Sequence, residues 1–394
     1  MYTEDNESHW FQRATEGDDV DTTNTSLRNA MRLLAALTLL LLAPENANAA
    51  PCDSLMRLQL ANTTITNARV VSPGAFHLRS RQRSSVEVFT AFDRLPAFCR
   101  VEATVSPSRD SHIEVEVWLP ATGWNGKFLG VGNGGFAGSL SYFRLGEAVN
   151  SGYAGASTDT GHKGRSRDSQ WSIGHPEKQT DFDYRAVHEM TVVAKAAIEA
   201  FYGRVPARSY FSSCSNGGRQ GLMEAQQYPA DYDGIMAGAP AMHLGFRTFV
   251  SDKVDAFRDR GGKLVIYHGS ADAPQNSVDF FQQLQSRLGR DAVDAFTQLY
   301  IVPGMGHCGS GEVPNDFGQW VRPNADPEHS MLKALERWVE LGVRPTSVIA
   351  TQWNKDGDTT SGVLRTRPLC PYPQTARWTG AGDKNDSKNY GCGS

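Results

Sequence analysis

Short apolar runs alternate with helical patterns along most of this 394-residue chain. Each apolar run is closed by glycine or by a turn, which is typical of buried strands. The expected strands are residues 113–119, 127–131, 153–157, 209–212, 235–238, 263–267 and 298–302. The expected helices between and after them are residues 184–201, 218–227, 278–288 and 331–341. Strands that alternate with helices predict an α/β fold with a mostly parallel sheet and helices on both faces.

The beginning of the chain has the order of a secretory signal peptide. A short basic segment at 28–32 is followed by an apolar run at 33–43 and by the small residues Ala47-Asn48-Ala49. The apolar run is too short for a bilayer span, which needs about 20 residues. We therefore expect residues 1–49 to be removed and the protein to be secreted or periplasmic. The acidic segment before Met31 is unusual for a signal peptide, so Met31 is an alternative start.

Residues 50–394 contain no internal repeat and no long low-complexity linker, so we expect a single domain. Their charge is close to neutral, which gives no reason to expect nucleic acid or a membrane as a partner. All six cysteines of the chain lie in this part. An even number in an exported chain favours disulfides, although the spacing does not choose among the many pairings. Metal binding is the weaker alternative, because the sequence contains no CxxC pair.

The segment 208–220, RSYFSSCSNGGRQ, predicts a strand, a tight turn and the start of a helix, with Ser215 at the apex. A nucleophilic serine on such a turn needs small residues two positions before and after it, because the backbones crowd there. Ser213 and Gly217 satisfy this requirement. The pattern S-C-S-N-G lacks the first glycine of G-x-S-x-G, and an ordinary Ser/Gly-rich loop is the alternative. The partners of Ser215 therefore decide the interpretation.

A serine nucleophile needs a base to accept its proton and an acid to orient that base. In this fold the acid and then the histidine follow the serine along the chain. The expected strand in KLVIYHGSAD delivers Asp272 at its carboxyl end, and the strand and glycine-rich turn in QLYIVPGMGHC end on His307. We therefore expect Ser215, Asp272 and His307 to form a catalytic triad.

Rival histidines and acids are weaker candidates. His243 precedes the acid, His268 ends the strand that carries Asp272 and is more consistent with a structural role, and His329 lies in a polar loop. The rival acids lie on what we expect to be a solvated helix: Asp252, Asp255 and Asp259.

A tetrahedral intermediate also requires backbone N–H donors for its oxyanion. We expect one from Asn216 and a second from the glycine-rich loop GVGNGGFAG at 130–138, at Gly134 or Gly135. A dinucleotide-binding loop is the alternative for this segment. It is disfavoured because the spacing differs from G-x-G-x-x-G and no long amphipathic helix is expected after it.

These stretches resemble the tannase and feruloyl esterase family, which also includes the hydrolase of mono(2-hydroxyethyl) terephthalate. The matching segments are FSSCSNGGRQGLMEAQQYPADYDGIMAGAPA, FRDRGGKLVIYHGSAD, VPGMGHCGSG and RPLCPYPQTARWTGAGD, with WNGKFLGVGNGG and STDTGH upstream. The resemblance implies an α/β-hydrolase fold and a serine esterase with a Ser-His-Asp triad. It further implies hydrolysis of feruloyl, galloyl or terephthalate-type esters through an acyl-enzyme.

The resemblance also implies how the cysteines pair. In the family, a cysteine just before the nucleophile is joined to one just after the catalytic histidine. The implied disulfides are Cys214–Cys308, Cys52–Cys99 and Cys370–Cys392.

One departure from the family lies between GAPA and the strand that leads to the acid. Family members usually carry a large lid domain there, with a calcium-binding loop, whereas this chain has only residues 242–255. We therefore expect no calcium, no other metal and no cofactor. The acyl site should be more open, so that small-molecule or polymer-attached esters are the expected partners.

Three other functions remain open from the sequence. The first is a non-catalytic binding protein that keeps the fold, and the second is an esterase for larger or non-aromatic esters. In the third, Cys214 is the nucleophile of a thiol hydrolase, which is disfavoured because an exported cysteine with Cys308 available is expected to be oxidised. The oligomeric state cannot be predicted.

Overall fold

The structure is a computed structural model that describes residues 49–78, 92–246 and 251–394. The predicted signal peptide, apart from Ala49, and the alternative start at Met31 lie outside these residues. No helix in the described part is long and apolar enough to cross a membrane. The chain from Ala49 to Ser394 forms one unit by its internal contacts.

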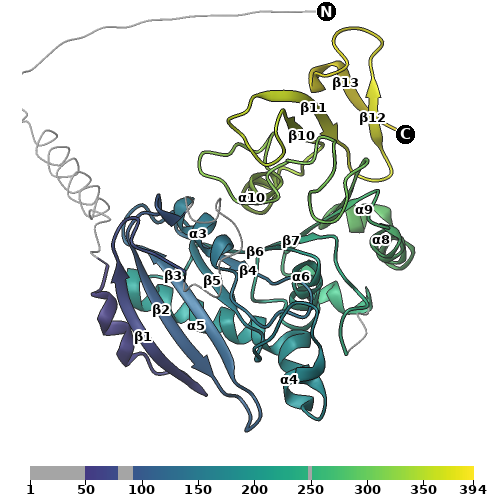
Figure 1. Cartoon of the computed structure of the whole chain (residues 1–394). Coiled ribbons are helices and arrows are strands. Elements are labelled where there is room, and N and C mark those ends of the chain that lie inside the picture. Colours follow the sequence, from purple (N-terminus) through teal and green to yellow (C-terminus); the bar gives the residue numbers. More distant parts are fainter. Residues whose placement is uncertain (1–48, 79–91, 247–250) are drawn as a thin grey trace, which may run out of the picture. The chain divides into compact units, whose positions relative to one another are not determined.

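A nine-stranded sheet runs through this unit (Figure 1). In spatial order its strands are β1 (Thr63–Val71), β2 (Phe98–Val105), β3 (Ile113–Pro120), β5 (Ala154–Thr158), β4 (Lys127–Val131), β6 (Arg208–Cys214), β7 (Gly234–Gly238), β8 (Lys263–Gly269) and β9 (Thr297–Val302). Pairing is antiparallel from β1 to β5 and parallel from β5 through β4 to β9. The predicted mostly parallel sheet is confirmed.

Apolar cores lie on both faces of the sheet, because neighbouring residues of a strand point to opposite sides. In β6, Phe211 belongs to one core together with Leu222 of α6, whereas Tyr210 belongs to the other together with Leu145 of α3 and Leu335 of α10. The helices are α3 (Tyr142–Asn150), α4 (Pro176–Thr180), α5 (Ala186–Tyr202), α6 (Asn216–Gln227), α7 (Asp255–Asp259), α8 (Gln275–Leu288), α9 (Arg290–Asp294) and α10 (Met331–Leu341). Helices on both faces were predicted, and this is confirmed.

Several elements were not predicted from the sequence. β1 and β2 extend the sheet at one edge. The helix α3, which has nine residues, follows the glycine-rich loop. The C-terminal part adds two small antiparallel sheets, β10 (Val348–Trp353) with β11 (Val363–Leu369) and β12 (Thr375–Trp378) with β13 (Tyr390–Gly393). Side chains of these four strands are largely exposed or half-buried, so they lack a continuous apolar run.

Three disulfides join all six cysteines in the pairs that the resemblance implied. They are Cys52–Cys99, Cys214–Cys308 and Cys370–Cys392. The first ties the segment before β1 to β2, and the last ties the end of β11 to β13. The second lies at the carboxyl ends of the parallel strands, where the candidate site is located.

Candidate active site

Ser215 lies on the sharp turn between β6 and α6. Its backbone has φ 64° and ψ −124°, in the region that favours glycine. The N–H of Ser215 donates to the carbonyl of Gly238 at 2.9 Å, and the carbonyl of Ser215 accepts from the N–H groups of Arg219 and Ala241, each at 3.1 Å. A strained serine held by its neighbours between a strand and a helix is the geometry of a nucleophile elbow.

The residues around this turn must be small, as predicted. A Cβ atom on Gly217 would lie 1.9 Å from the Oγ atom of Ser213, and one on Gly218 would lie 2.2 Å from the carbonyl oxygen of Gly238. Neither position has room for a side chain. Close packing of the turn therefore requires glycine at both positions.

The loops after β8 and β9 bring the predicted acid and base together. The Nδ1 atom of His307 lies 2.5 Å from the Oδ2 atom of Asp272. The His307 side chain is 51 % exposed, and that of Asp272 is 25 % exposed. With Nδ1 held by the carboxylate, Nε2 is the nitrogen left to exchange a proton with a substrate or a serine.

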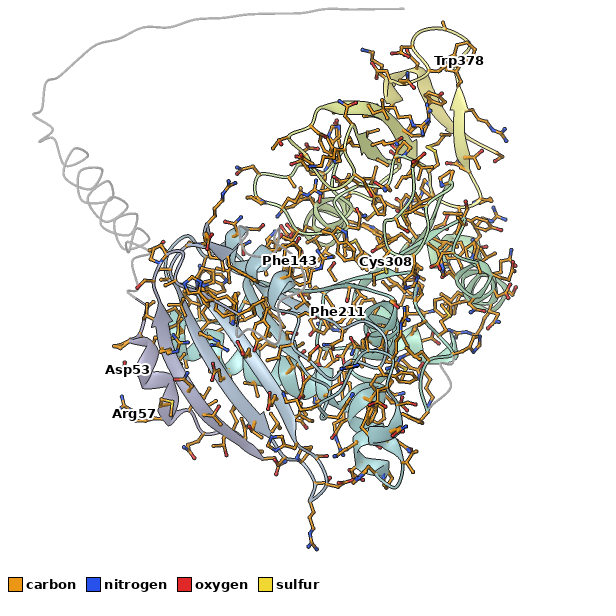
Figure 2. The ribbon with its side chains drawn as sticks, in the orientation of Figure 1. Asp53, Arg57, Phe143, Phe211, Cys308 and Trp378 are labelled. Atoms are coloured by element: carbon orange, nitrogen blue, oxygen red, sulfur yellow. A yellow bond between two sulfur atoms is a disulfide. The ribbon has the colours of Figure 1, made fainter. Side chains whose placement is uncertain are left out.

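The disulfide Cys214–Cys308 links Ser215 to this pair. The Cα atoms of the two cysteines are 5.9 Å apart, and Figure 2 shows Cys308 beside the carboxyl ends of the strands. Neighbouring Cα atoms are about 3.8 Å apart, so those of Ser215 and His307 are at most about 13.5 Å apart. No hydrogen bond joins Ser215 to His307 in the described residues, and such contacts commonly tighten only when a substrate binds.

The rival residues have other partners or no site around them. His243 is exposed, and His329 contacts Asp326 at 3.1 Å. Asp255 pairs with Arg287 and Asp259 with Arg258, at positions open to solvent. The side chain of Asp252 lies outside the described residues. His268 is the exception, because it is buried and lies against Asp272.

The glycine-rich loop packs directly against the elbow. A Cβ atom on Gly132 would lie 2.9 Å from the Cα atom of Gly217, and the N–H of Asn133 donates to Oε1 of Gln220 in α6 at 3.0 Å. Gly134 is exposed, with open space where a side chain would be. Gly135 has φ +55°, and a Cβ there would meet the carbonyl oxygen of Ser166.

Three N–H groups near the elbow remain available as donors. Within the described residues, the amides of Gly134, Gly135 and Asn216 donate no hydrogen bond to the protein. Asn216 is the first residue of α6, where a backbone N–H has no intrahelical acceptor. These are the groups that the sequence predicted for the oxyanion.

Sequence reasoning missed the role of Arg219, which is only 2 % exposed. Its Nε donates to Oδ1 of Asn216 at 2.8 Å, Nη1 to the carbonyl of Asp183 and Nη2 to the carbonyl of Phe182, both at 3.0 Å. Burial lowers the pKa of Arg219 to about 10. The carboxylate of Asp183 accepts from the N–H of Phe246 at 2.9 Å, so the short segment in the lid position is tied to the same cluster.

An aromatic cluster adjoins the glycine-rich loop and was also missed. His162, from the STDTGH segment, lies with Nε2 2.7 Å from the carbonyl oxygen of Phe136. Its ring stacks on Trp171 at 3.6 Å, and Trp171 contacts Phe182 and Phe246. Burial lowers the pKa of His162. Because the residues come from distant segments, only the unusual STDTGH motif could have pointed to them.

No group of three or more His, Cys, Asp or Glu side chains in the described part of the chain could hold a metal ion. The chemistry that the site offers is that of a serine on an elbow, a histidine paired with a carboxylate and free backbone N–H donors. This set of groups is typical of acyl transfer.

The family model described as tannase and feruloyl esterase matches residues 99–254 and 250–393. The chain belongs to the tannase and feruloyl esterase family. It is 28 % identical to an uncharacterized esterase of Xanthomonas campestris pv. campestris over 556 residues, covering 93 % of this chain and 95 % of the relative. It is 24 % identical to feruloyl esterase B of Aspergillus niger over 501 residues, covering 85 % and 94 %. Membership in this family makes the chain a carboxylic ester hydrolase.

Two solved structures of esterases have the same fold as this chain. An esterase from Aspergillus oryzae superposes with a TM-score of 0.76 at 21 % identity, covering 86 % of this chain and 99 % of that one. Feruloyl esterase B from Aspergillus oryzae superposes with a TM-score of 0.74 at 22 % identity, over the same shares. The resemblance noted from the sequence is thereby confirmed for family and fold.

The two sequence alignments extend over 556 and 501 residues, although this chain has only 394. The relatives therefore contain long segments that this chain lacks. The family model matches in two parts that meet at residues 250–254. These residues lie inside the predicted shortened lid segment, residues 242–255.

Proposed function

We propose that the chain hydrolyses carboxylic esters of hydroxylated aromatic acids through an acyl-enzyme on Ser215. Feruloyl, galloyl and terephthalate-type esters are the proposed substrates, because relatives of this chain are named feruloyl esterases. The observation that carries the proposal is the contact of 2.5 Å between His307 and Asp272 beside a disulfide that reaches the residue before Ser215.

In the proposed mechanism, the Oγ atom of Ser215 attacks the ester carbonyl while Nε2 of His307 takes its proton. Asp272 accepts the Nδ1–H of His307 and stabilises the imidazolium. The N–H groups of Asn216 and of Gly134 or Gly135 bind the oxyanion. The proton then passes to the leaving alcohol, and water hydrolyses the acyl-enzyme by the same steps in reverse order.

The shortened lid segment bears on which esters the site accepts. Only residues 242–255 lie where the family usually has a lid, so less protein surface is available to enclose a small acyl group. The proposed site is therefore open and admits larger or polymer-attached esters as well as small ones. A calcium requirement is not part of the proposal, because the segment that would bind the ion is absent from the sequence.

Export from the cytoplasm is also proposed. Three disulfides form and persist in oxidising compartments, which fits a secreted or periplasmic protein. An ester substrate is the proposed partner, rather than nucleic acid or a membrane.

The test is hydrolysis of an ester panel by the wild type, by Ser215→Ala and by Ser286→Ala, an exposed serine of α8 that serves as the control. The panel contains an aryl acetate, methyl ferulate, methyl gallate and mono(2-hydroxyethyl) terephthalate. Turnover by the wild type and Ser286→Ala, with loss in Ser215→Ala, is the expected result. Turnover that survives in Ser215→Ala would exclude Ser215 as the nucleophile, and no turnover by the wild type would favour a binding protein.

A further inference from the structure

His268 is a buried histidine that touches the proposed catalytic acid. It lies in β8 and is 5 % exposed. Its Nε2 atom is 3.1 Å from the main-chain carbonyl oxygen of Asp272 and 3.3 Å from Oδ2 of the same residue. Its Nδ1 atom is 2.8 Å from Oγ of Ser277, a fully buried residue in the first turn of α8. The imidazole therefore connects β8, the loop that carries the acid and α8.

The neighbours of this imidazole determine its tautomer. Both oxygens of Asp272 that face Nε2 can only accept hydrogen bonds when the acid is ionised, so Nε2 must carry the hydrogen. In a neutral imidazole Nδ1 is then an acceptor, and the hydroxyl of Ser277 can donate to it. The result is one ordered chain in which Ser277 donates to His268 and His268 donates to Asp272.

The same carboxylate oxygen faces both histidines. Oδ2 of Asp272 lies 2.5 Å from Nδ1 of His307 and 3.3 Å from Nε2 of His268. A carboxylate on a loop can rotate about its side-chain bonds, and rotation would take Oδ2 away from His307. The Nε2 atom of His268, fixed 3.3 Å from the same oxygen, restricts that rotation.

We infer that His268 is a positioning residue, a neutral hydrogen-bond donor that holds Asp272 so that Oδ2 faces Nδ1 of His307. This inference rests on the proposed function of Asp272 and His307. It assigns His268 no proton transfer to the substrate, because its two nitrogens are both engaged within the protein.

Burial favours the neutral form of His268. Burial lowers the pKa of His268, and the nearby His307 lowers it further, whereas Asp272 acts in the opposite direction. In the described residues, the group of α8 that bonds to His268 is the hydroxyl of Ser277, which carries no charge. The titratable groups near His268 are Asp272 and His307. A neutral donor orients Asp272 without neutralising the carboxylate that stabilises the His307 imidazolium.

The experiment compares His268→Gln, His268→Leu and Ser277→Ala with the wild type. The glutamine amide can place an N–H near the position of Nε2, whereas leucine fills similar space without a donor. The control is His175→Gln, a histidine that is 44 % exposed and pairs with Asp110 on another part of the chain. For each protein we would measure kcat and KM over pH, thermal unfolding, and the low-field proton resonance of the His307–Asp272 hydrogen bond. Titration of Ser215 with a fluorophosphonate gives the fraction of folded sites.

We expect His268→Leu to lower kcat per titrated site by about 10- to 100-fold, with KM changed by less than about threefold, as for loss of a hydrogen bond to a charged group. Its low-field resonance should broaden. His268→Gln should recover most of the lost kcat and a sharp resonance. The kcat of Ser277→Ala should lie between those of His268→Leu and the wild type. The control His175→Gln should have the kcat of the wild type.

Two results would overturn the inference while leaving the triad intact. In the first, His268→Leu keeps the kcat of the wild type per titrated site and loses only thermal stability. In the second, His268→Gln is as slow as His268→Leu, so that the donor is irrelevant. Failure of the triad itself would be recognised separately, because Asp272→Asn would then retain the kcat of the wild type.

Discussion

The disulfide between Cys214 and Cys308 joins the residue before Ser215 to the residue after His307. In the sheet, β7 and β8 lie between β6, which carries Cys214, and β9, which precedes Cys308. The Cα atoms of the bonded cysteines are only 5.9 Å apart, so the loop after β9 must extend past the ends of β8 and β7 to reach Cys214. The proposed nucleophile and base are held by a covalent link as well as by packing.

Removing this disulfide should impair activity as well as stability. It closes a loop with a sequence separation of 94 residues, so the double variant Cys214→Ala/Cys308→Ala should lose about 2–5 kcal/mol of unfolding free energy. Its kcat should fall by about tenfold or more, because a displacement of about 1 Å at a reacting group is costly. Urea unfolding and ester hydrolysis check both effects.

The matched control is Cys370→Ala/Cys392→Ala, which opens the C-terminal disulfide with a separation of 22 residues. It should lower stability with kcat unchanged. Equal losses of kcat in the two double variants would contradict a specific role for the link beside Ser215.

Gly217→Ala should damage the elbow. The added Cβ would overlap Oγ and Cβ of Ser213, so the turn must open, at a cost of about 1–3 kcal/mol or more. We expect lower unfolding free energy and a large loss of kcat. Gly391→Ala is the control, because nothing lies within 4 Å of the Cβ position in β13. A Gly217→Ala enzyme with the activity of the wild type would show that the turn has more room than the structure indicates.

Arg219→Met should remove the cation whose Nη1 lies 3.7 Å from Oδ1 of the buried Asp183 carboxylate. Breaking a buried ion pair on one side costs about 3–5 kcal/mol. The variant should also lose activity, since Nε of Arg219 no longer fixes the side chain of Asn216. Chemical denaturation measures the first effect and kcat the second.

A control for this variant is Arg344→Met, whose side chain is 46 % exposed and pairs with Asp294. Exposed pairs contribute about 0–1 kcal/mol, so its stability should hardly change. The additional change Asp183→Asn should recover part of the stability of Arg219→Met. If the double variant is no more stable than Arg219→Met, the two side chains are not coupled.

His162 should make stability depend on pH. Burial lowers its pKa in the folded protein below the unfolded value of about 6.5, so the unfolded chain binds more protons just below that pH. Unfolding free energy should therefore be fully present above about pH 6.5 and decline as the pH falls through the folded pKa. The slope should be smaller in His162→Gln, measured by urea unfolding between about pH 5 and 8. An unchanged slope would assign the effect to other groups.

Chelation should leave the activity unchanged. The segment at 242–255 is too short to hold the lid in which family members are expected to bind calcium. Hydrolysis of methyl ferulate before and after treatment with EDTA checks this, with a relative that contains the longer segment as the comparison. Loss of activity that calcium restores would show a site outside the lid position.

Elements with continuous apolar runs could be predicted closely. β4 and α10 have the bounds expected from the sequence, 127–131 and 331–341. β1 could not be found in this way, because most of its side chains are exposed or half-buried and its residues include Asn67 and Arg69. The helix expected from 184 begins at Ala186, after a π-helical turn over Asp181–Arg185 that changes the local spacing.

Some residues of the candidate site could be predicted from the sequence and others could not. Ser215, Asp272 and His307 could be proposed because each ends a recognisable strand and their order along the chain is restrictive. Arg219 and Asp183 could not, because a contact between residues 36 positions apart leaves no local pattern. The sequence indicates only a structural role for His268, and no local pattern shows which of its nitrogens faces Asp272.

The Cys214–Cys308 bond also turns the chain from β6 to the loop after β9 into a closed ring, which contains α6, β7, α7, β8, α8, α9 and β9. A protease that cuts once inside this ring, for example in the exposed stretch around His243, would leave the two pieces covalently joined. The nicked protein would migrate as one species until the disulfide is reduced. If the chain is exported as proposed, one cut in the shortened lid segment by a secreted protease would then leave Ser215 and His307 covalently linked.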